Sequence, residues 1–69
     1  MIVSTGNEKV DIRQLKRGIV VQVDLGDDYK FLQPAHIEGF GYMTELDEIP
    51  LIVAIAGELH TVDSRNVYL

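Results

Sequence analysis

The segment from Gly18 to Leu25, GIVVQVDL, narrows the folds open to this chain more than any other part of the sequence. Its side chains alternate with a period of two, which is the repeat of a strand that buries one face. β-branched residues dominate the segment, and Gly18 and Gly26 bound it. We expect a strand with one face formed by Ile19, Val21, Val23 and Leu25 and the other by Val20, Gln22 and Asp24.

The residues before this strand, Asp11 to Gly18, predict a short helix. Asp11 can cap a first turn, Gln14 stands three residues later as in a capping box, and Gly18 favours a left-handed stop. Ile12 and Leu15 fall on one face and would hold the turn against a core. One or two turns of helix are therefore expected near the N-terminus.

Residues 26–34 predict the second half of a hairpin. The stretch 26–28, GDD, favours a turn, and 29–33, YKFLQ, alternates as a strand does. Pro34 has no backbone N–H to give to a ladder, so we expect the strand to end there. Residues 35–50 show the least regular pattern and are expected to be mostly loop.

The run from Leu51 to Ala56, LIVAIA, is apolar at every position, which is typical of a strand covered on both faces. Gly57-Glu58 then has the composition of a type II′ hairpin turn, with Gly57 at its first central position. A short last strand follows the turn-rich residues 63–66.

These elements predict a mainly β chain with one domain over residues 1–69. We expect a five-stranded, strongly bent sheet or barrel with one short helical turn near the N-terminus. The order of elements resembles the architecture of SH3-like or Sm-like small barrels, in which a leucine-lysine-x-glycine turn feeds the first long strand. This resemblance implies a fold and no functional residues.

The size and composition of the chain predict a low stability and a location in the cell. A domain of 69 residues hides only about 60% of the surface of its unfolded chain. No cysteine is present to form disulfides, so self-association is the remaining means of stabilisation. No apolar run is long enough to span a membrane, and we expect a cytoplasmic protein with no membrane partner.

The stretch 38–43, EGFGYM, resembles the octapeptide with which RNA-recognition-motif domains stack bases. Residues 39–42 match that pattern, but Glu38 replaces its basic residue and Glu45 its last aromatic. The upstream strand carries no aromatic residue, and the spacing leaves no room for the helix of that fold. We interpret the stretch as a glycine-hinged aromatic segment, in which Phe40 and Tyr42 either fill the core or face a protein partner.

The sequence favours a protein that is not an enzyme. His60, Asp63 and Ser64 hold the residue types of a hydrolase triad, but such close neighbours cannot converge as a triad requires. His36 and Glu38 could share a strand face and, with His60, approach a metal, which is a weak signal without a recognisable ligand spacing. We expect no catalytic residue, no metal and no cofactor.

We predict a protein-interaction module or small structural or regulatory subunit that presents an aromatic face. Aromatic side chains are favoured at the centres of interfaces, and glycines let a partner backbone approach. The candidate binding residues are Tyr29, Phe40, Tyr42, Gly39 and Gly41. The expected partner is another protein or a second copy of this chain.

The charge distribution leaves two alternatives open. The net charge is −5, with +2 in residues 1–17 and −7 in residues 18–69. An oligomeric barrel could gather the basic segment into a nucleic-acid-binding rim; its residues would be Lys9, Arg13, Lys16 and Arg17. The acidic remainder could instead mimic nucleic acid and block a basic partner.

Overall fold

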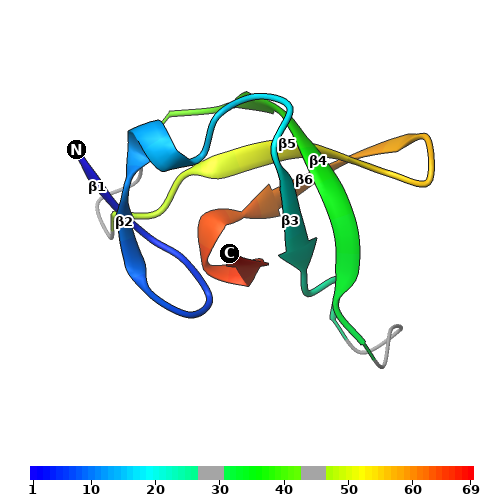
Figure 1. Ribbon diagram of the computed structural model, residues 1–69, viewed down its shortest axis with the longest axis horizontal. Coiled ribbons are helices and arrows are strands. Elements are labelled where there is room, and N and C mark those ends of the chain that lie inside the picture. The colour runs from blue at the N-terminus through cyan, green and yellow to red at the C-terminus, as the bar shows by residue number, and fades with distance from the viewer. Residues whose placement is uncertain (27–30, 43–46) are drawn as a thin grey trace.

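The computed structural model describes residues 1–26, 31–42 and 47–69, and within these ranges the chain is mainly β (Figure 1). A five-stranded antiparallel sheet has the order β6-β5-β4-β3-β7, and β1 and β2 form a separate hairpin. The elements are β1 (Ile2–Ser4), β2 (Lys9–Asp11), η1 (Ile12–Gln14), β3 (Val20–Val23), β4 (Gln33–Phe40), β5 (Pro50–Ile55), β6 (Glu58–Asp63), η2 (Ser64–Asn66) and β7 (Val67–Tyr68). The predicted β class and five-stranded sheet are confirmed, and the sheet does not close into a barrel within these ranges.

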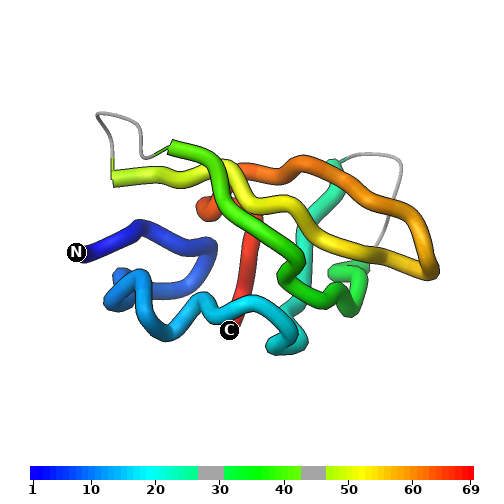
Figure 2. Tube along the Cα trace, turned by 90° about the horizontal axis from the view of Figure 1, so that it is seen from above, coloured from blue at the N-terminus to red at the C-terminus, as the bar shows by residue number. Residues whose placement is uncertain are grey.

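One face of the sheet packs against the N-terminal hairpin and forms the core. Figure 2 shows the hairpin and the segment after it on one side of the molecule, with β5 and β6 on the other. The buried side chains are aliphatic: Val3, Val10, Leu15, Val21, Val23, Ala35, Ile37, Ile49, Leu51, Val53 and Val67. No aromatic side chain belongs to this core in the part of the chain that the structure describes.

Strand β3 has the alternation that the sequence predicts. Val21 and Val23 are buried, whereas Val20 and Gln22 are exposed on the other face. The segment before it, where the sequence predicts one or two turns of helix, contains the three-residue 3₁₀ helix η1. The Asp11 carboxylate caps η1 by accepting the backbone N–H of Arg13 at 2.9 Å.

Strand β4 corrects the expectation that Pro34 ends a strand and that a loop follows. Pro34 is the second residue of an eight-residue strand and lies opposite Gln22 of β3. Hydrogen-bonded and open pairs alternate in antiparallel strands. Ile37 donates to Ile19 O at 3.0 Å, so the pair Ala35–Val21, two residues along, is also hydrogen-bonded, and the pair Pro34–Gln22 is open. The nitrogen of Pro34 therefore faces away from β3, beyond the paired part of β5, where no N–H is required.

A bulge interrupts the pairing of β4 with β5 at Glu38. Ile37 pairs with Val53 and Gly39 pairs with Ile52, so Glu38 is one extra residue on β4. Phe40 consequently lies opposite the buried Leu51, on the core side of the sheet. Strict alternation along β4 would have placed Phe40 on the opposite face.

The turn between β5 and β6 also differs from the predicted type II′ turn. Ile55 pairs with Glu58, so the two central residues are Ala56 and Gly57 rather than Gly57 and Glu58. Both have positive φ, 50° and 84°, which is the signature of a type I′ turn. An alanine occupies a position that favours asparagine or glycine.

Backbone hydrogen bonds fasten the N-terminal hairpin to the segment before β5 and to β7. Ser4 donates to Asp47 O at 2.8 Å, and Gly6 donates to Val67 O at 2.7 Å. The Asn7 side chain donates to Leu69 O and accepts from Leu69 N. The tip of the hairpin thus covers the outer edge of β7.

A reciprocal pair of hydrogen bonds joins the start of β5 to η2. Ser64 is fully buried; its N–H donates to Ile49 O at 2.9 Å, and its Oγ accepts from Ile49 N at 3.1 Å. Ile49 is itself buried, so neither backbone group has ready access to water. Ser64 therefore has a structural role.

Replacement of Ser64 by Ala tests this fastening. Ser64→Ala leaves the buried Ile49 N–H without an acceptor and should lower the free energy of unfolding by about 1 to 3 kcal/mol. Urea denaturation followed by circular dichroism measures the loss. Thr61→Ala, at an exposed position of β6, is the matched control and should change the midpoint little; equal effects of both substitutions would refute the structural role.

Replacement of Ala56 tests the turn. Ala56→Asn should stabilise the chain by up to about 1 kcal/mol, because asparagine tolerates the left-handed conformation better than alanine. Ala56→Val should destabilise it, since a β-branched side chain fits positive φ poorly. Thermal midpoints of the two variants should therefore move in opposite directions, and a rise for both would contradict the type I′ geometry.

Candidate interaction surface

The face of the sheet away from the core carries exposed apolar side chains. One row across four strands joins Val20 of β3, His36 of β4, Ala54 of β5 and Leu59 of β6. Val20 is 58% exposed and Leu59 is 68% exposed. With strands about 4.8 Å apart, the row spans roughly 14 Å.

A second row lies beside the first. Gly39, Ile52 and Thr61 pair across β4, β5 and β6, and Ile52 is 38% exposed. We call the two rows, together with the neighbouring Pro34, the outer face. Its members are Val20, Pro34, His36, Gly39, Ile52, Ala54, Leu59 and Thr61.

The outer face corrects the expectation that β5 is covered on both sides. Leu51 and Val53 are buried, but Ile52 between them is exposed on the opposite face. No described element packs over Ile52, Val20 and Leu59. Within the described residues, β5 therefore buries only one of its two apolar faces.

The predicted aromatic residues lie in different places. Phe40 is 42% exposed at the end of β4, on the side of the buried Leu51, and Tyr42 is 96% exposed just beyond it. Phe31 is exposed at the opposite end of β4. Tyr29 lies outside the described residues. Phe40 and Tyr42 thus both lie at one end of β4.

The two predicted glycines differ in their surroundings. A Cβ at Gly39 would meet Ile52 Cδ1 at 3.7 Å, an ordinary contact on the outer face. A Cβ at Gly41 would come within 2.9 Å of Pro50 Cγ, and Gly41 N–H donates to Pro50 O at 2.8 Å. Gly41 therefore permits the close approach of the chain to β5, rather than leaving space for a partner.

The predicted basic residues are all exposed, but carboxylates face two of them. Arg13 Nη2 lies 3.0 Å from Asp11 Oδ2, and Arg17 Nε lies 3.9 Å from Glu38 Oε2. The hydrogen bond from the Arg13 side chain holds the pKa of Asp11 well below its usual range, and Asp11 in turn raises the pKa of Arg13. Lys9 stands on β2, and Lys16 follows η1.

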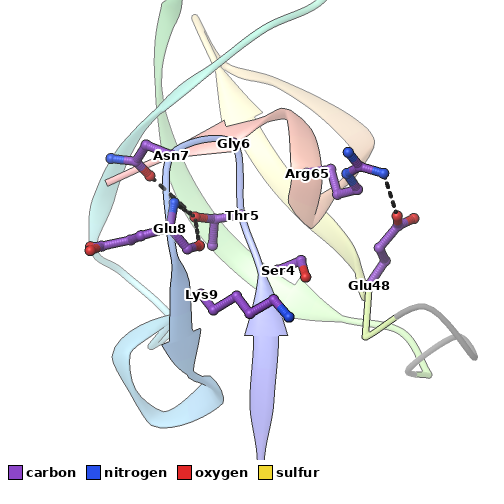
Figure 3. Close-up of a pocket in the computed structure, with 8 residues that line it drawn as sticks. All are labelled: Ser4, Thr5, Gly6, Asn7, Glu8, Lys9, Glu48 and Arg65. Carbon is purple, nitrogen blue, oxygen red and sulfur yellow. Dashed lines mark hydrogen bonds and ion pairs between the residues drawn. The ribbon is translucent and has the colours of Figure 1, made fainter.

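Lys9 also lines a shallow pocket of about 380 Å³ beside the β1–β2 turn (Figure 3). The other lining residues are Ser4, Thr5, Gly6, Asn7, Glu8, Glu48 and Arg65. Arg65 Nη1 lies 3.3 Å from Glu48 Oε1, and Thr5 Oγ1 donates to Asn7 Oδ1 and Glu8 O within the turn. Two cations and two carboxylates balance here, so the pocket favours neither an anion nor a cation.

The other chemical candidates are separated by the fold. His36 belongs to the outer face, whereas His60 pairs with Val53 on the core side. The two imidazoles therefore cannot bind one metal ion, and the described residues contain no cluster of three metal-ligating side chains. Asp63 caps η2 by accepting the N–H of Arg65 at 3.0 Å, and Ser64 is buried, so neither approaches His60 as a triad partner.

Sequence reasoning missed Val20, Ile52 and Leu59 as surface candidates. A signal for two of them is present: Val20 is an apolar residue in the polar set of β3, and Ile52 stands in the run apolar at every position. Leu59 could not be assigned to a face without the register of β6.

Comparisons with protein-family models, with curated proteins and with solved structures found no match. No helix in residues 1–26, 31–42 and 47–69 has the length and apolar character needed to cross a membrane.

The ion pair of Asp11 predicts a pH dependence of stability. A carboxyl whose pKa is lower in the folded than in the unfolded chain stabilises the fold above its unfolded pKa of about 4 and loses this contribution as the pH falls toward the folded value. Asp11→Asn should lower the urea midpoint at pH 7 and have less effect at pH 3.

Arg13→Gln supplies the matched control for this prediction. It removes the same ion pair from the other side, so the double variant should be little less stable than either single variant. If the urea midpoints of the wild-type chain and Asp11→Asn differed by the same amount at pH 7 and at pH 3, the prediction would be contradicted.

Proposed function

We propose that this protein is a non-enzymatic interaction module whose outer face docks another protein. The observation that supports the proposal is that β5 is apolar on both faces but buries only one of them. Ile52 projects from this inner strand of the sheet onto a face that no described element covers. Val20 and Leu59 extend the apolar surface to either side. Burial of such side chains is favourable by about 25 cal/mol per Å² of apolar area.

The chemistry of this face favours a protein over a charged ligand. Among its members only His36 carries a titratable side chain, and Glu38 at the bulge borders it with a carboxylate. A phosphate-bearing partner would meet no lysine or arginine in either row. An apolar centre with a polar border is the composition of protein interfaces.

Phe40 and Tyr42 lie next to this proposed surface at one end of β4, with Phe40 on the side of Leu51 and Tyr42 exposed beyond the strand. They directly follow Gly39 of the outer face, and both are exposed. Aromatic side chains at such a position supply contact area at low cost in conformational entropy. They retain in this proposal the binding role that the sequence predicts for them.

We also propose that the chain is one small domain related in architecture to SH3-like or Sm-like barrels. The strand order β6-β5-β4-β3-β7 and the 3₁₀ helix between β6 and β7 support this view. The fold alone assigns no function, so the docking proposal depends only on the surface itself.

Binding of nucleic acid through Lys9, Arg13, Lys16 and Arg17 stays a prediction that no observation favours. If it were correct, the chain would bind generic oligonucleotides at low salt and lose affinity steeply as the salt concentration rises. The pairing of Arg13 and Arg17 with carboxylates gives less available positive charge than the sequence alone suggests.

Site-specific photocrosslinking tests the docking proposal. The chain has no cysteine, so Ile52→Cys and Val20→Cys can each carry a benzophenone label, with Gln14→Cys on η1 as the control outside the outer face. In a lysate of the source cells, both outer-face labels should capture the same protein and the control should not.

A second variant makes this result decisive. The captured protein, once purified, should bind the wild-type chain and bind Ile52→Asp at least tenfold more weakly, because a carboxylate would be buried in the contact. Equal capture from all three labels, or unchanged affinity of a folded Ile52→Asp, would overturn the proposal.

A further inference from the structure

The two edges of the five-stranded sheet differ in their protection. At one edge, the hairpin tip covers β7 through the bond from Gly6 to Val67 and the contacts of Asn7 with Leu69. At the other edge, β6 pairs with β5 on one side only, and no described residue pairs with its second side. Among the described residues, the sheet therefore presents one open edge.

The register of the β5–β6 hairpin determines which backbone groups point outward from this edge. In a two-residue hairpin the pair that flanks the turn, Ile55 and Glu58, exchanges hydrogen bonds, and hydrogen-bonded pairs recur at every second residue. His60 therefore bonds inward to Val53. The N–H and C=O groups of Leu59 and Thr61 point away from the sheet.

Strand β6 carries carboxylates only at its two ends, Glu58 and Asp63. Its six residues, ELHTVD, contain no proline and no lysine, and its register with β5 runs without a bulge. Leu59 adds a 68% exposed apolar side chain on the outer face. An edge with these features is a template for another strand.

We propose that β6 pairs antiparallel with β6 of a second copy of this chain, about a two-fold axis at His60. In this register Leu59 of each copy exchanges backbone hydrogen bonds with Thr61 of the other, and His60 faces His60. Glu58 lies opposite Val62, so no carboxylate faces another. The apolar outer faces of the two copies become continuous.

The side chains favour this register over its neighbours. An axis at Thr61 would place Leu59 against the Asp63 carboxylate of the second copy, and an axis at Leu59 would require bonds from Gly57, which has a φ of 84° in the turn. Asp24 and Gly26 line one recess with Thr61 and Asp63, which narrows the approach at that end of β6. The residues of β6 before Thr61 do not line this recess.

A second copy also fits the open edge better than a longer assembly does. The covered edge of β7 cannot accept β6 from another molecule without displacing the hairpin tip, so head-to-tail pairing into a ring is blocked. Pairing of like edges closes after two copies. This inference is independent of the protein partner proposed for the outer face.

The mass of the species in solution, measured by analytical ultracentrifugation over a range of concentrations, tests the dimer. The wild-type chain should be a dimer that dissociates on dilution. Thr61→Pro removes an outward N–H next to the axis and no bond to β5, so it should remain folded and weaken dimerisation by about tenfold or more.

Two lysine substitutions supply a matched pair. Leu59→Lys and Val20→Lys both place a charge on the outer face, but only Leu59 belongs to the edge strand. Leu59→Lys should weaken the dimer and Val20→Lys should leave it intact. A monomeric wild-type chain at all concentrations, or equal weakening by both variants, would overturn the proposal.

Disulfide trapping tests the register. Two residues facing each other in a non-hydrogen-bonded pair have Cα atoms about 4.5 Å apart, within the range that a disulfide requires. His60→Cys should therefore crosslink two copies under mild oxidation, whereas Thr61→Cys should not. Crosslinking of Thr61→Cys alone, or of neither variant, would overturn the axis at His60. A failure to find a protein partner for the outer face would not bear on the dimer.

Discussion

A five-stranded sheet has two faces to cover, and in this chain the hairpin β1–β2 covers one of them. The hairpin contributes Val3 and Val10 to a core made of aliphatic side chains, and backbone bonds from Ser4 and Gly6 fix it to Asp47, before β5, and to Val67 of β7. Removal of these side chains from water is the main favourable term in folding. Both the buried core and the exposed outer face follow from this one-sided cover.

The sequence predicted β3 well because local signals agree there. Alternation, β-branched residues and the glycines at either end all indicate the same strand. Strand β4 was missed because two local signals mislead: Pro34 suggests an end, and the bulge at Glu38 breaks the period of two. Whether a proline is tolerated depends on which neighbouring strand its nitrogen faces, and that is a property of the assembled sheet.

The candidate surface was predicted only in part, because the exposure of a side chain also depends on the assembled sheet. Phe40 and Tyr42 are recognisable from the sequence as aromatic residues in a glycine-rich stretch, and both are exposed. The face of Phe40 depends on the bulge, and the exposure of Ile52 depends on the absence of a second covering layer over β5 in the described residues. A strand pattern shows which residues are apolar, but the tertiary arrangement decides which of them are covered.

The cover that the hairpin tip gives to β7 also bears on how this protein behaves at high concentration. A sheet with two open edges can add strands without limit and seed a fibre. Here Gly6 and Asn7 occupy one of those edges, so extension from the native sheet can proceed in one direction only. The β1–β2 hairpin therefore limits strand addition at this edge, in addition to its part in forming the core.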